Sequence, residues 1–335
     1  MSKEKINQLR SVMGTLPDQD PPLGTKFIRG VEGIKVELID YNVNPYKSLY
    51  VMATSCWGKK INKWDETEPE HRFEVVKAVL TGNALPLALE APVFTFAIEG
   101  PSRAAFDQLA RTRLGAVFSA RGVRDNNWKD ASIRVPTCLW PLYDHEETIL
   151  VNTKEMYADI VNSGKASWQA ARFCLPMNIC YGWSVSYNYN SLRGVCANRM
   201  KFCEMEDTVA TAWLMKKAVD EKFPLLGNYL RPGCDYAGKC QYHRSYTLSE
   251  MFGCLFKECG RNPCPDSNDY SEFNEVCTNY GELEEQLDVH ITHPNEWLEY
   301  ENYEDLAGSD KGYFEDRVSR IVPSYGCQES LKEGE

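Results

Sequence analysis

One stretch constrains the fold more than any other: a strand-like run that stops at a glycine–proline pair and is followed at once by a helix start. The run Ala91–Gly100 is rich in residues that favour strands, and Gly100-Pro101 interrupts it. Ser102 then occupies the position of a helix N-cap, so we predict a helix from Arg103 to about Phe118. A strand joined so closely to a helix indicates a domain that mixes both kinds of element.

The same mixture is predicted on both sides of this stretch. Apolar and charged residues alternate in Gly33–Tyr41, which predicts a half-buried strand, and Leu49–Thr54 is a second strand candidate. Pro69–Leu80 has the apolar spacing of a helix. We therefore expect an α/β (α+β mixed) fold in which a central sheet is flanked by long helices.

Three further helices are predicted downstream. Met156–Gly164 ends at a glycine, as helices commonly do. Ser167 is placed to cap the next helix, which Pro176 stops. An apolar stripe then predicts one long helix from about Ser191 to Lys222.

Arginines lie between apolar side chains in the segment after Ser102. Gln108 and Arg111 are three residues apart and would share one helical face, and Arg113 and Arg121 follow. One interpretation is a helix whose charged side faces solvent. The other is a site for an anionic ligand, because guanidinium groups form paired hydrogen bonds with phosphate and carboxylate.

Arg199 interrupts the apolar stripe of the predicted helix 191–222. An arginine that faces a protein core is costly unless it is paired. The spacing alone slightly favours an internal pair, with Glu204 or Glu206, over a bound anion.

The formal net charge of −11 argues against a general nucleic-acid binder, whose surface would be basic. Residues 1–14 lack the apolar core of a signal peptide, and no run approaches the roughly 18 apolar residues that a membrane span needs. We expect a cytoplasmic protein (in the host cytoplasm if the chain is viral), with no membrane association and no direct nucleic-acid binding. Most of its cysteines should then be reduced.

The amino-acid composition of the chain changes at about Pro232. This change divides the chain into a domain 1–232 and a Cys-rich, acidic C-terminal extension 233–335. Four cysteines of the extension, with His243 nearby, are compatible with a structural zinc site, although one spacing is wider than usual: Cys234, Cys240, Cys259 and Cys264. An iron–sulfur cluster, a redox pair and buried free thiols remain open, with buried thiols slightly favoured over zinc.

Two blocks of the chain resemble the flavin-dependent thymidylate synthases. Phe94–Arg113 reads FTFAIEGPSRAAFDQLARTR and is similar to the family's strand and the following helix that ends in Arg-His-Arg. Ala170–Arg199 reads AARFCLPMNICYGWSVSYNYNSLRGVCANR and is similar to a second block with an Ala-Arg…Leu-Pro element. Asp40–Trp57 matches the opening strand weakly. The resemblance covers roughly Gly33–Pro232.

The resemblance implies a homotetramer with sites at its subunit interfaces, each of which binds FAD, dUMP, NADPH and methylenetetrahydrofolate. The implied reaction is methylation of dUMP at uracil C5 to give dTMP, with NADPH as the reductant and the folate as the one-carbon donor. No cysteine nucleophile is needed.

The resemblance also implies roles for particular residues. Arg111 and Arg113 take the two arginine positions of Arg-His-Arg and, with Asn188, would contact FAD. Arg199 would contact the pyrimidine beside the flavin and would be the catalytic residue. The remaining positions implied to contact the nucleotide are Gln108, Ser119, Arg121 and Arg172.

The chain departs from the family pattern at three places. Thr112 replaces the middle histidine of Arg-His-Arg, and Ala91 stands where a histidine usually contacts the flavin. The Ser-x-Arg pattern fits Ser119–Arg121 only with a two-residue deletion. Two alternatives therefore stay open: flavin- and folate-dependent hydroxymethylation of dUMP or dCMP for modified-DNA synthesis, and a non-catalytic nucleotide-binding relative.

Overall fold

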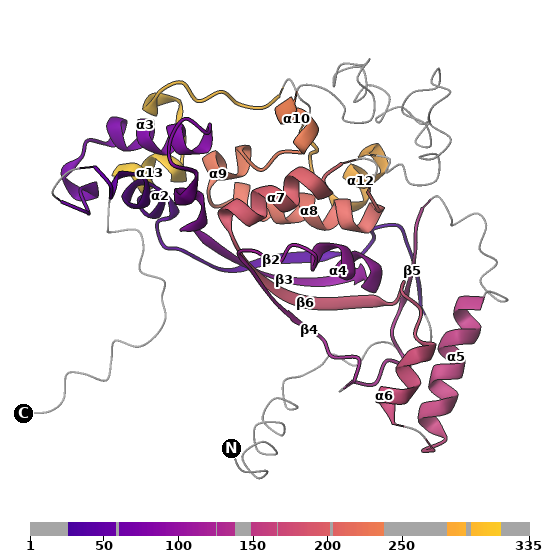
Figure 1. Cartoon of the computed structure of the whole chain (residues 1–335). Helices are drawn as coiled ribbons and strands as arrows, with labels where there is room; N and C mark the ends of the chain where they lie inside the picture. Colours follow the sequence, from indigo (N-terminus) through magenta and orange to yellow (C-terminus); the bar gives the residue numbers. More distant parts are fainter. Residues whose placement is uncertain are drawn as a thin grey trace, which may run out of the picture.

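The computed structural model describes residues 26–57, 60–124, 126–137, 149–165, 167–201, 204–237, 280–292 and 296–315. Its centre is a four-stranded antiparallel sheet in the order β2-β3-β6-β4 (Figure 1). The strands of this sheet are β2 Lys35–Tyr41, β3 Val93–Ser102, β4 Ala116–Ala120 and β6 Cys180–Asn188. A separate parallel pair is formed by β1 Phe27–Arg29 and β5 Ile133–Val135. The expected mixed α/β fold with a central sheet is confirmed.

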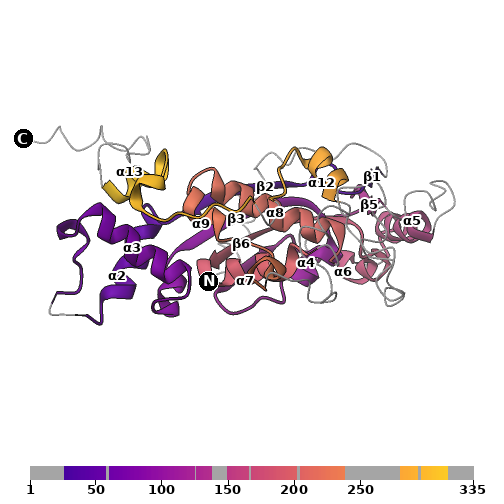
Figure 2. The same cartoon turned by 90° about the horizontal axis from the view of Figure 1, so that it is seen from above.

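Helices surround the sheet on one face and at both ends (Figures 1 and 2). Above the sheet in Figure 1 lie α7 Tyr189–Arg199, α8 Glu206–Asp220 and α9 Pro224–Asn228, with α4 Arg103–Leu109 in front of the strands. The other helices are α2 Pro45–Thr54, α3 Pro69–Leu80, α5 Ile149–Asn162, α6 Trp168–Ala171, α10 Gly233–Ala237, α12 Tyr280–Leu287 and α13 Ser309–Glu315. Short 3-10 turns are η1 Trp64–Glu66, η2 Pro86–Glu90, η4 Arg172–Cys174 and η6 Tyr303–Asp305.

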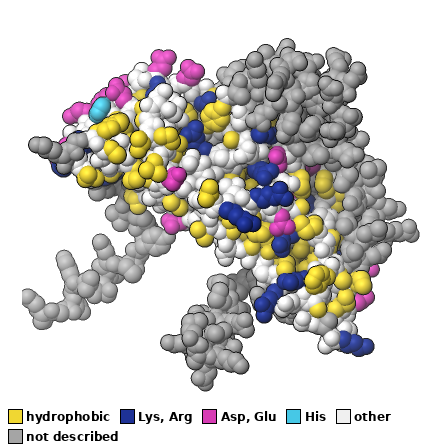
Figure 3. All heavy atoms as spheres, viewed as in Figure 1, with side chains coloured by type: hydrophobic (Ala, Val, Ile, Leu, Met, Phe, Trp, Pro, Cys, Tyr) yellow, Lys and Arg dark blue, Asp and Glu magenta, His cyan; other side chains and the backbone are white. Residues whose placement is uncertain are grey.

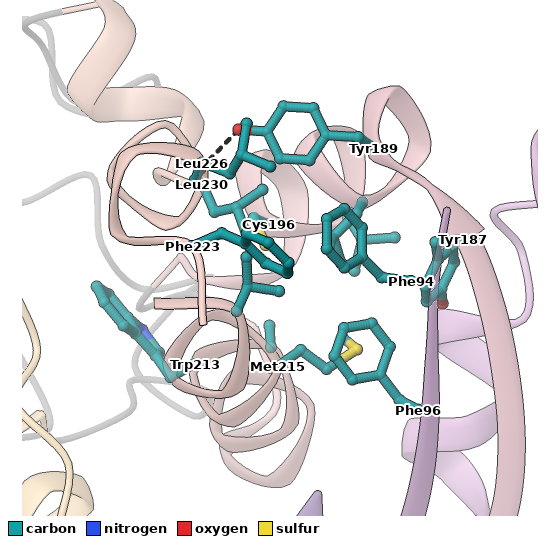
Figure 4. Close-up of a cluster of buried hydrophobic side chains, with 14 of the residues drawn as sticks. Phe94, Phe96, Tyr187, Tyr189, Cys196, Trp213, Met215, Phe223, Leu226 and Leu230 are labelled. Atoms are coloured by element: carbon teal, nitrogen blue, oxygen red, sulfur yellow. Dashed lines mark hydrogen bonds between the residues drawn. The ribbon is translucent and has the colours of Figure 1, made fainter. Parts of the chain in front are cut away.

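The main core lies between the sheet and the helices above it. Alternate residues of β6 are buried, which is the pattern of a strand with one covered face. Phe94 and Phe96 of β3 point toward α7 and α8, where Met215 and Phe223 meet them (Figure 4). Tyr189 closes this cluster by donating its hydroxyl hydrogen to the Leu226 carbonyl at 2.6 Å.

Several local expectations are confirmed. The predicted helix 69–80 is α3, and the alternating run 33–41 contains β2. Ser102 caps α4 by accepting a hydrogen bond from the Ala105 amide at 3.1 Å. Gly164, with φ +65°, follows α5, although that helix begins earlier than predicted. Ser167 caps the turn that starts α6.

The strand predicted at Leu49–Thr54 is wrong, because these residues belong to α2. Asn44 caps this helix through a hydrogen bond from the Lys47 amide at 2.8 Å, and a proline occupies its first turn. The buried residues of α2 include Tyr46, Leu49, Tyr50 and Ala53, which follow helical spacing. The helix start outweighed the local strand propensity.

The helix predicted from Arg103 to Phe118 is also wrong in its second half. It ends at Leu109, and Ala116–Ala120 forms β4, the edge strand beside β6. Gly115 turns the chain between the two with φ +64°. Phe118 packs edge-on against Phe106 and Tyr187, so the apolar residues that suggested a helical stripe contribute to a strand.

The single helix predicted over 191–222 is two helices, because α7 ends at Arg199 and α8 begins at Glu206. Asn188 caps α7 by accepting the Ser191 amide at 2.8 Å. The Tyr280 hydroxyl donates to the Met200 carbonyl at 2.6 Å, which ties the break between the helices to α12. The strand β6 was not predicted, although its alternating aromatic residues carry the signal of a half-buried strand.

The described parts of the C-terminal extension pack against the rest of the chain. The ring of Phe314 in α13 stacks on Tyr46 of α2 with a centroid distance of 4.7 Å. The Asn228 side chain donates to the Leu298 carbonyl at 2.9 Å. The division of the chain at residue 232 stays a prediction.

Candidate functional site

The connection between α4 and β4 runs alongside α7. At one end, the Arg199 guanidinium donates from Nη2 to the Gln108 carbonyl at 3.3 Å. At the other end, the Ser191 hydroxyl donates to the Leu114 carbonyl and the Asn188 amide donates to the Gly115 carbonyl at 2.8 Å. The connection therefore follows the 11-residue helix α7 over about 16 Å.

We call the side chains along this connection and at the two ends of α7 the arginine strip: Gln108, Arg111, Thr112, Arg113, Asn188 and Arg199. All six were singled out from the sequence, and the structure brings them to one side of α7.

The two arginines in the middle of the strip are exposed. Arg111 and Arg113 follow the end of α4, and Thr112 between them is half-buried. Among the described residues, none forms a side-chain hydrogen bond or ion pair with either guanidinium. Both groups keep their donors available to a ligand. They are loop residues and not helical ones, which corrects the expected helical face.

Gly115 allows the strip to lie close to α7. Its positive φ is a conformation that glycine adopts readily, and a Cβ there would collide with the Asn188 side chain. The turn at Gly115 therefore packs closely against the N-terminus of α7, which places Asn188 beside the connection between α4 and β4.

Ala91 lies at the same end of the sheet. Its neighbour Pro92 accepts a hydrogen bond from the Tyr189 amide at 2.8 Å, and Val93 pairs with Asn188. The half-buried Ala91 is therefore near Asn188, and its methyl side chain offers no hydrogen bond.

Arg199 is held by protein groups. Its Nη1 forms an ion pair with Glu204 Oε2 at 2.7 Å, so the internal pair predicted from spacing is confirmed with Glu204. The alternative partner, Glu206, instead accepts hydrogen bonds from the amide and hydroxyl of Thr137 at 3.0 and 2.8 Å. Burial raises the pKa of the Glu206 carboxyl, and the bonds from Thr137 oppose this.

Residues that follow Glu204 in the chain hold the Gln108 side chain in place. Its side-chain NH2 donates to Met205 Sδ at 2.9 Å, and its side-chain oxygen lies 3.5 Å from the Thr208 hydroxyl. Met205 and Thr208 were missed by sequence reasoning, which had placed residues 200–205 inside one helix and so gave them no special position.

Three other expected nucleotide contacts lie away from the strip. Ser119 pairs with Ser184 in β4 and β6, and strand alternation points it to the sheet face opposite Phe118. Arg121 lies over the Trp128 ring, 5.0 Å from its centroid, and was not expected to stack there. Arg172 is in η4, before β6 begins, whereas Asn188 is at the end of this nine-residue strand, which is about 26 Å long.

Charge is distributed unevenly over the surface. In the view of Figure 3, Lys and Arg side chains form a band that runs from the helical layer across the sheet toward α6. Asp and Glu side chains gather at the opposite end, over α2 and α3. The negative net charge is therefore compatible with a locally basic face that attracts anions.

The predicted zinc ligands cannot be placed. Cys240, Cys259 and Cys264, together with His243, lie outside the described residues, and Cys234 is described only as part of α10. No group of three or more His, Cys, Asp or Glu side chains that could hold a metal occurs in the described part of the chain. The zinc site stays a prediction.

One described cysteine is deeply buried against the helical core. Burial raises the pKa of the Cys196 thiol to about 12, which keeps it protonated and unreactive.

Within the residues that the structure describes, we find no helix with both the length and the apolar character that a membrane crossing requires.

Comparison with known proteins gives concordant matches. The sequence profile of the family described as thymidylate synthase complementing protein matches residues 37–225. The flavin-dependent thymidylate synthase of Thermococcus onnurineus is 28% identical over 229 residues, which cover 62% of this chain and 89% of that protein. The enzyme of the same name from Pyrococcus furiosus is 25% identical over 219 residues, with coverage of 62% and 89%. The crystal structure of the UMP/dUMP methylase PolB from Streptomyces cacaoi with 5-Br dUMP aligns with a TM-score of 0.48 and 16% identity, over 61% of this chain and 96% of that one.

Proposed function

We propose that this chain, which belongs to the family of thymidylate synthase complementing proteins, is a flavin-dependent enzyme. The proposed reaction methylates dUMP at uracil C5 to give dTMP. NADPH is the proposed reductant and methylenetetrahydrofolate the one-carbon donor. The single observation that carries the proposal is the arginine strip, in which two exposed guanidinium groups and the paired Arg199 line one side of α7. Relatives named flavin-dependent thymidylate synthase support it.

The donor set of the strip fits FAD. The planar guanidinium groups of Arg111 and Arg113 suit a diphosphate or an electron-rich ring. Asn188 uses its side-chain oxygen to cap α7, so its NH2 group is the one left for a ligand. Thr112 adds one hydroxyl, whereas Ala91 can only pack. When bound, the flavin supplies hydride transfer.

Gln108 and Arg199 are the proposed nucleotide contacts within one chain. Arg199 donates hydrogen bonds next to where the cofactor residues lie, which suits a carbonyl oxygen of the pyrimidine. Its role is to orient the base and to stabilise charge that develops on that oxygen during the reaction.

Ser119, Arg121 and Arg172 are proposed to complete the nucleotide site from a neighbouring subunit. Within one chain, Arg172 lies before the start of β6 and Asn188 lies at the end of this strand of about 26 Å, which favours contacts of the two residues with different nucleotides. A homotetramer with sites at its interfaces would bring these residues to the strip of another copy.

The proposal is tested by spectroscopy followed by a product assay. The purified full-length chain, incubated with FAD, should show flavin absorption bands that bleach under anaerobic NADPH, and should convert dUMP to dTMP when methylenetetrahydrofolate is added. The absence of flavin bands together with intact dUMP binding would favour the non-catalytic relative. A hydroxymethylated product, from dUMP or dCMP, would favour the hydroxymethylating alternative.

A further inference from the structure

We propose that Glu204 is a positioning residue that acts through Arg199, an inference that rests on the proposed function. The Glu204 carboxylate forms an ion pair with Arg199 at 2.7 Å, and both side chains are largely buried, with 20% and 21% of their surfaces exposed for Arg199 and Glu204. An ion pair this well shielded is screened less by solvent and salt than one at an open surface.

Glu204 occupies a segment that is anchored on both sides. Before it, the Met200 carbonyl accepts the Tyr280 hydroxyl at 2.6 Å. After it, the Asp207 side chain accepts the Ser102 amide at 2.8 Å, at the start of α4. Glu204 therefore lies between two tethered residues, Met200 and Asp207, and its neighbour Met205 is the partner of Gln108.

Two separate contacts orient the Arg199 guanidinium. Glu204 holds Nη1, and the Gln108 carbonyl holds Nη2. Because the guanidinium is planar, two anchored nitrogens define the direction of its remaining donors. Removal of one anchor frees the side chain to rotate, and a displacement of about 1 Å in a catalytic group can cost on the order of 100-fold in rate.

Glu204 also balances the charge of Arg199. The pair has no net charge, so it is suited to donate to the neutral carbonyl edge of a pyrimidine and poorly suited to attract a phosphate. Arg111 and Arg113, which are exposed, keep their full charge for anionic groups. Recognition of the base is thus assigned to Arg199 at one end of the strip, and recognition of anionic groups to Arg111 and Arg113 in its middle.

The test compares Glu204→Gln with Glu204→Ala in the full-length protein. The glutamine retains an oxygen that can accept from Arg199 but removes the negative charge. We expect it to keep kcat within about 5-fold and to steepen the salt dependence of dUMP binding, because Arg199 becomes a net cation. The alanine removes the anchor, and we expect kcat/KM to fall by about 10- to 100-fold.

A double-mutant cycle with Arg199→Lys shows whether Glu204 acts through Arg199. Glu204→Ala should cost far less in the Arg199→Lys background than in the wild type. Glu284→Gln is the matched control, since Glu284 is about as exposed (24%) but lies on α12 and pairs with His290; it should change neither kcat nor the salt dependence.

Equal losses in both backgrounds, or an unchanged Glu204→Ala variant, would overturn the role of Glu204. If Glu204→Ala does not fold, an unchanged salt dependence in Glu204→Gln is sufficient to overturn it. Failure of the wild type itself to bind dUMP would instead refute the proposed function, so the two failures are distinguishable.

Discussion

Two regions of the molecule use polar groups in opposite ways. One is the end built by α2, α3 and α13, and the other is the arginine strip. At the first, which we call the closed end, Asp310 accepts hydrogen bonds from the Tyr46 hydroxyl and the Leu225 amide, and Arg72 donates to the Phe314 carbonyl. All of these groups are buried. In the strip, Arg111 and Arg113 are exposed.

The comparison separates charged groups that serve the fold from charged groups that are proposed to bind a ligand. At the closed end, protein groups are the partners of Asp310, Tyr46 and the Arg72 Nη1 donor, which is the arrangement that stability requires of buried polar groups. In the strip, the donors of Arg111 and Arg113 stay available although these residues lie on a well-anchored connection. The closed end should therefore respond to substitution mainly in folding, and the strip mainly in binding and turnover.

The largest expected effect is at the closed end. Phe314 is fully buried and stacks on Tyr46. Phe314→Ala should lower the free energy of unfolding by about 3–5 kcal/mol, because it leaves a cavity. Chemical denaturation measures this. Leu298→Ala, in the same segment but 59% exposed, should change it by less than about 1 kcal/mol. A similar loss of unfolding free energy in both variants would show that Phe314 of α13 is not part of a well-packed core.

At the strip, Arg199→Ala should reduce kcat by about 100- to 1000-fold, as expected when a donor to a developing charge is removed. The change in circular dichroism should be small, because α7 and its cap are retained. Asn198→Ala, at the exposed neighbouring position, serves as the control and should stay active. Wild-type turnover in Arg199→Ala would refute its assigned role.

A pH titration sharpens the comparison, because desolvation raises the pKa of Asp310 to about 7. A carboxyl that holds its proton more tightly when folded stabilises the fold below its unfolded pKa of 3.8 and loses this contribution as the pH rises through 7. Relative to Asp310→Asn, the wild type should lose about 2 kcal/mol of unfolding free energy between pH 5 and 7. Parallel stability curves for the two proteins would contradict this.

The smallest effect concerns flavin retention. Arg111→Ala should weaken FAD binding about 10-fold, consistent with the loss of one charge-assisted hydrogen bond of about 1.5 kcal/mol. The Kd from a flavin fluorescence titration provides the measurement. Arg124→Ala removes an equally exposed arginine outside the strip and should leave the Kd unchanged. If both variants weaken binding alike, the strip has no privileged role.

Local patterns predicted local structure well. The helix α3, the strand β2 and the caps at Ser102 and Ser167 follow from residues within one or two turns of each other. The strand β6 was within reach of the same reasoning, because its aromatic residues alternate. Gln108, Arg111, Arg113 and Asn188, which the sequence singled out, lie beside or at the start of α7, and their roles in binding stay a prediction.

Long-range contacts decided what the patterns left ambiguous. Val117 and Phe118 fit a helical stripe as well as a strand, and pairing with β6 selects the strand. The run 191–222 fits one helix, but α7 ends at Arg199 and α8 begins at Glu206, and Met200 and Met205 form hydrogen bonds with Tyr280 and Gln108 instead. Such contacts join segments that are tens of residues apart, and no periodicity reports them.

The sequence by itself determined the mixed α/β class, the family blocks and the arginines that are proposed to bind a ligand, because these depend on residue type and local spacing. Only the tertiary structure decided that Glu204 is the partner of Arg199, that the strip follows α7 and that Arg172 lies in η4, before the start of β6. The physical reason is that a side chain's chemistry belongs to its residue, whereas its partner depends on how distant segments pack.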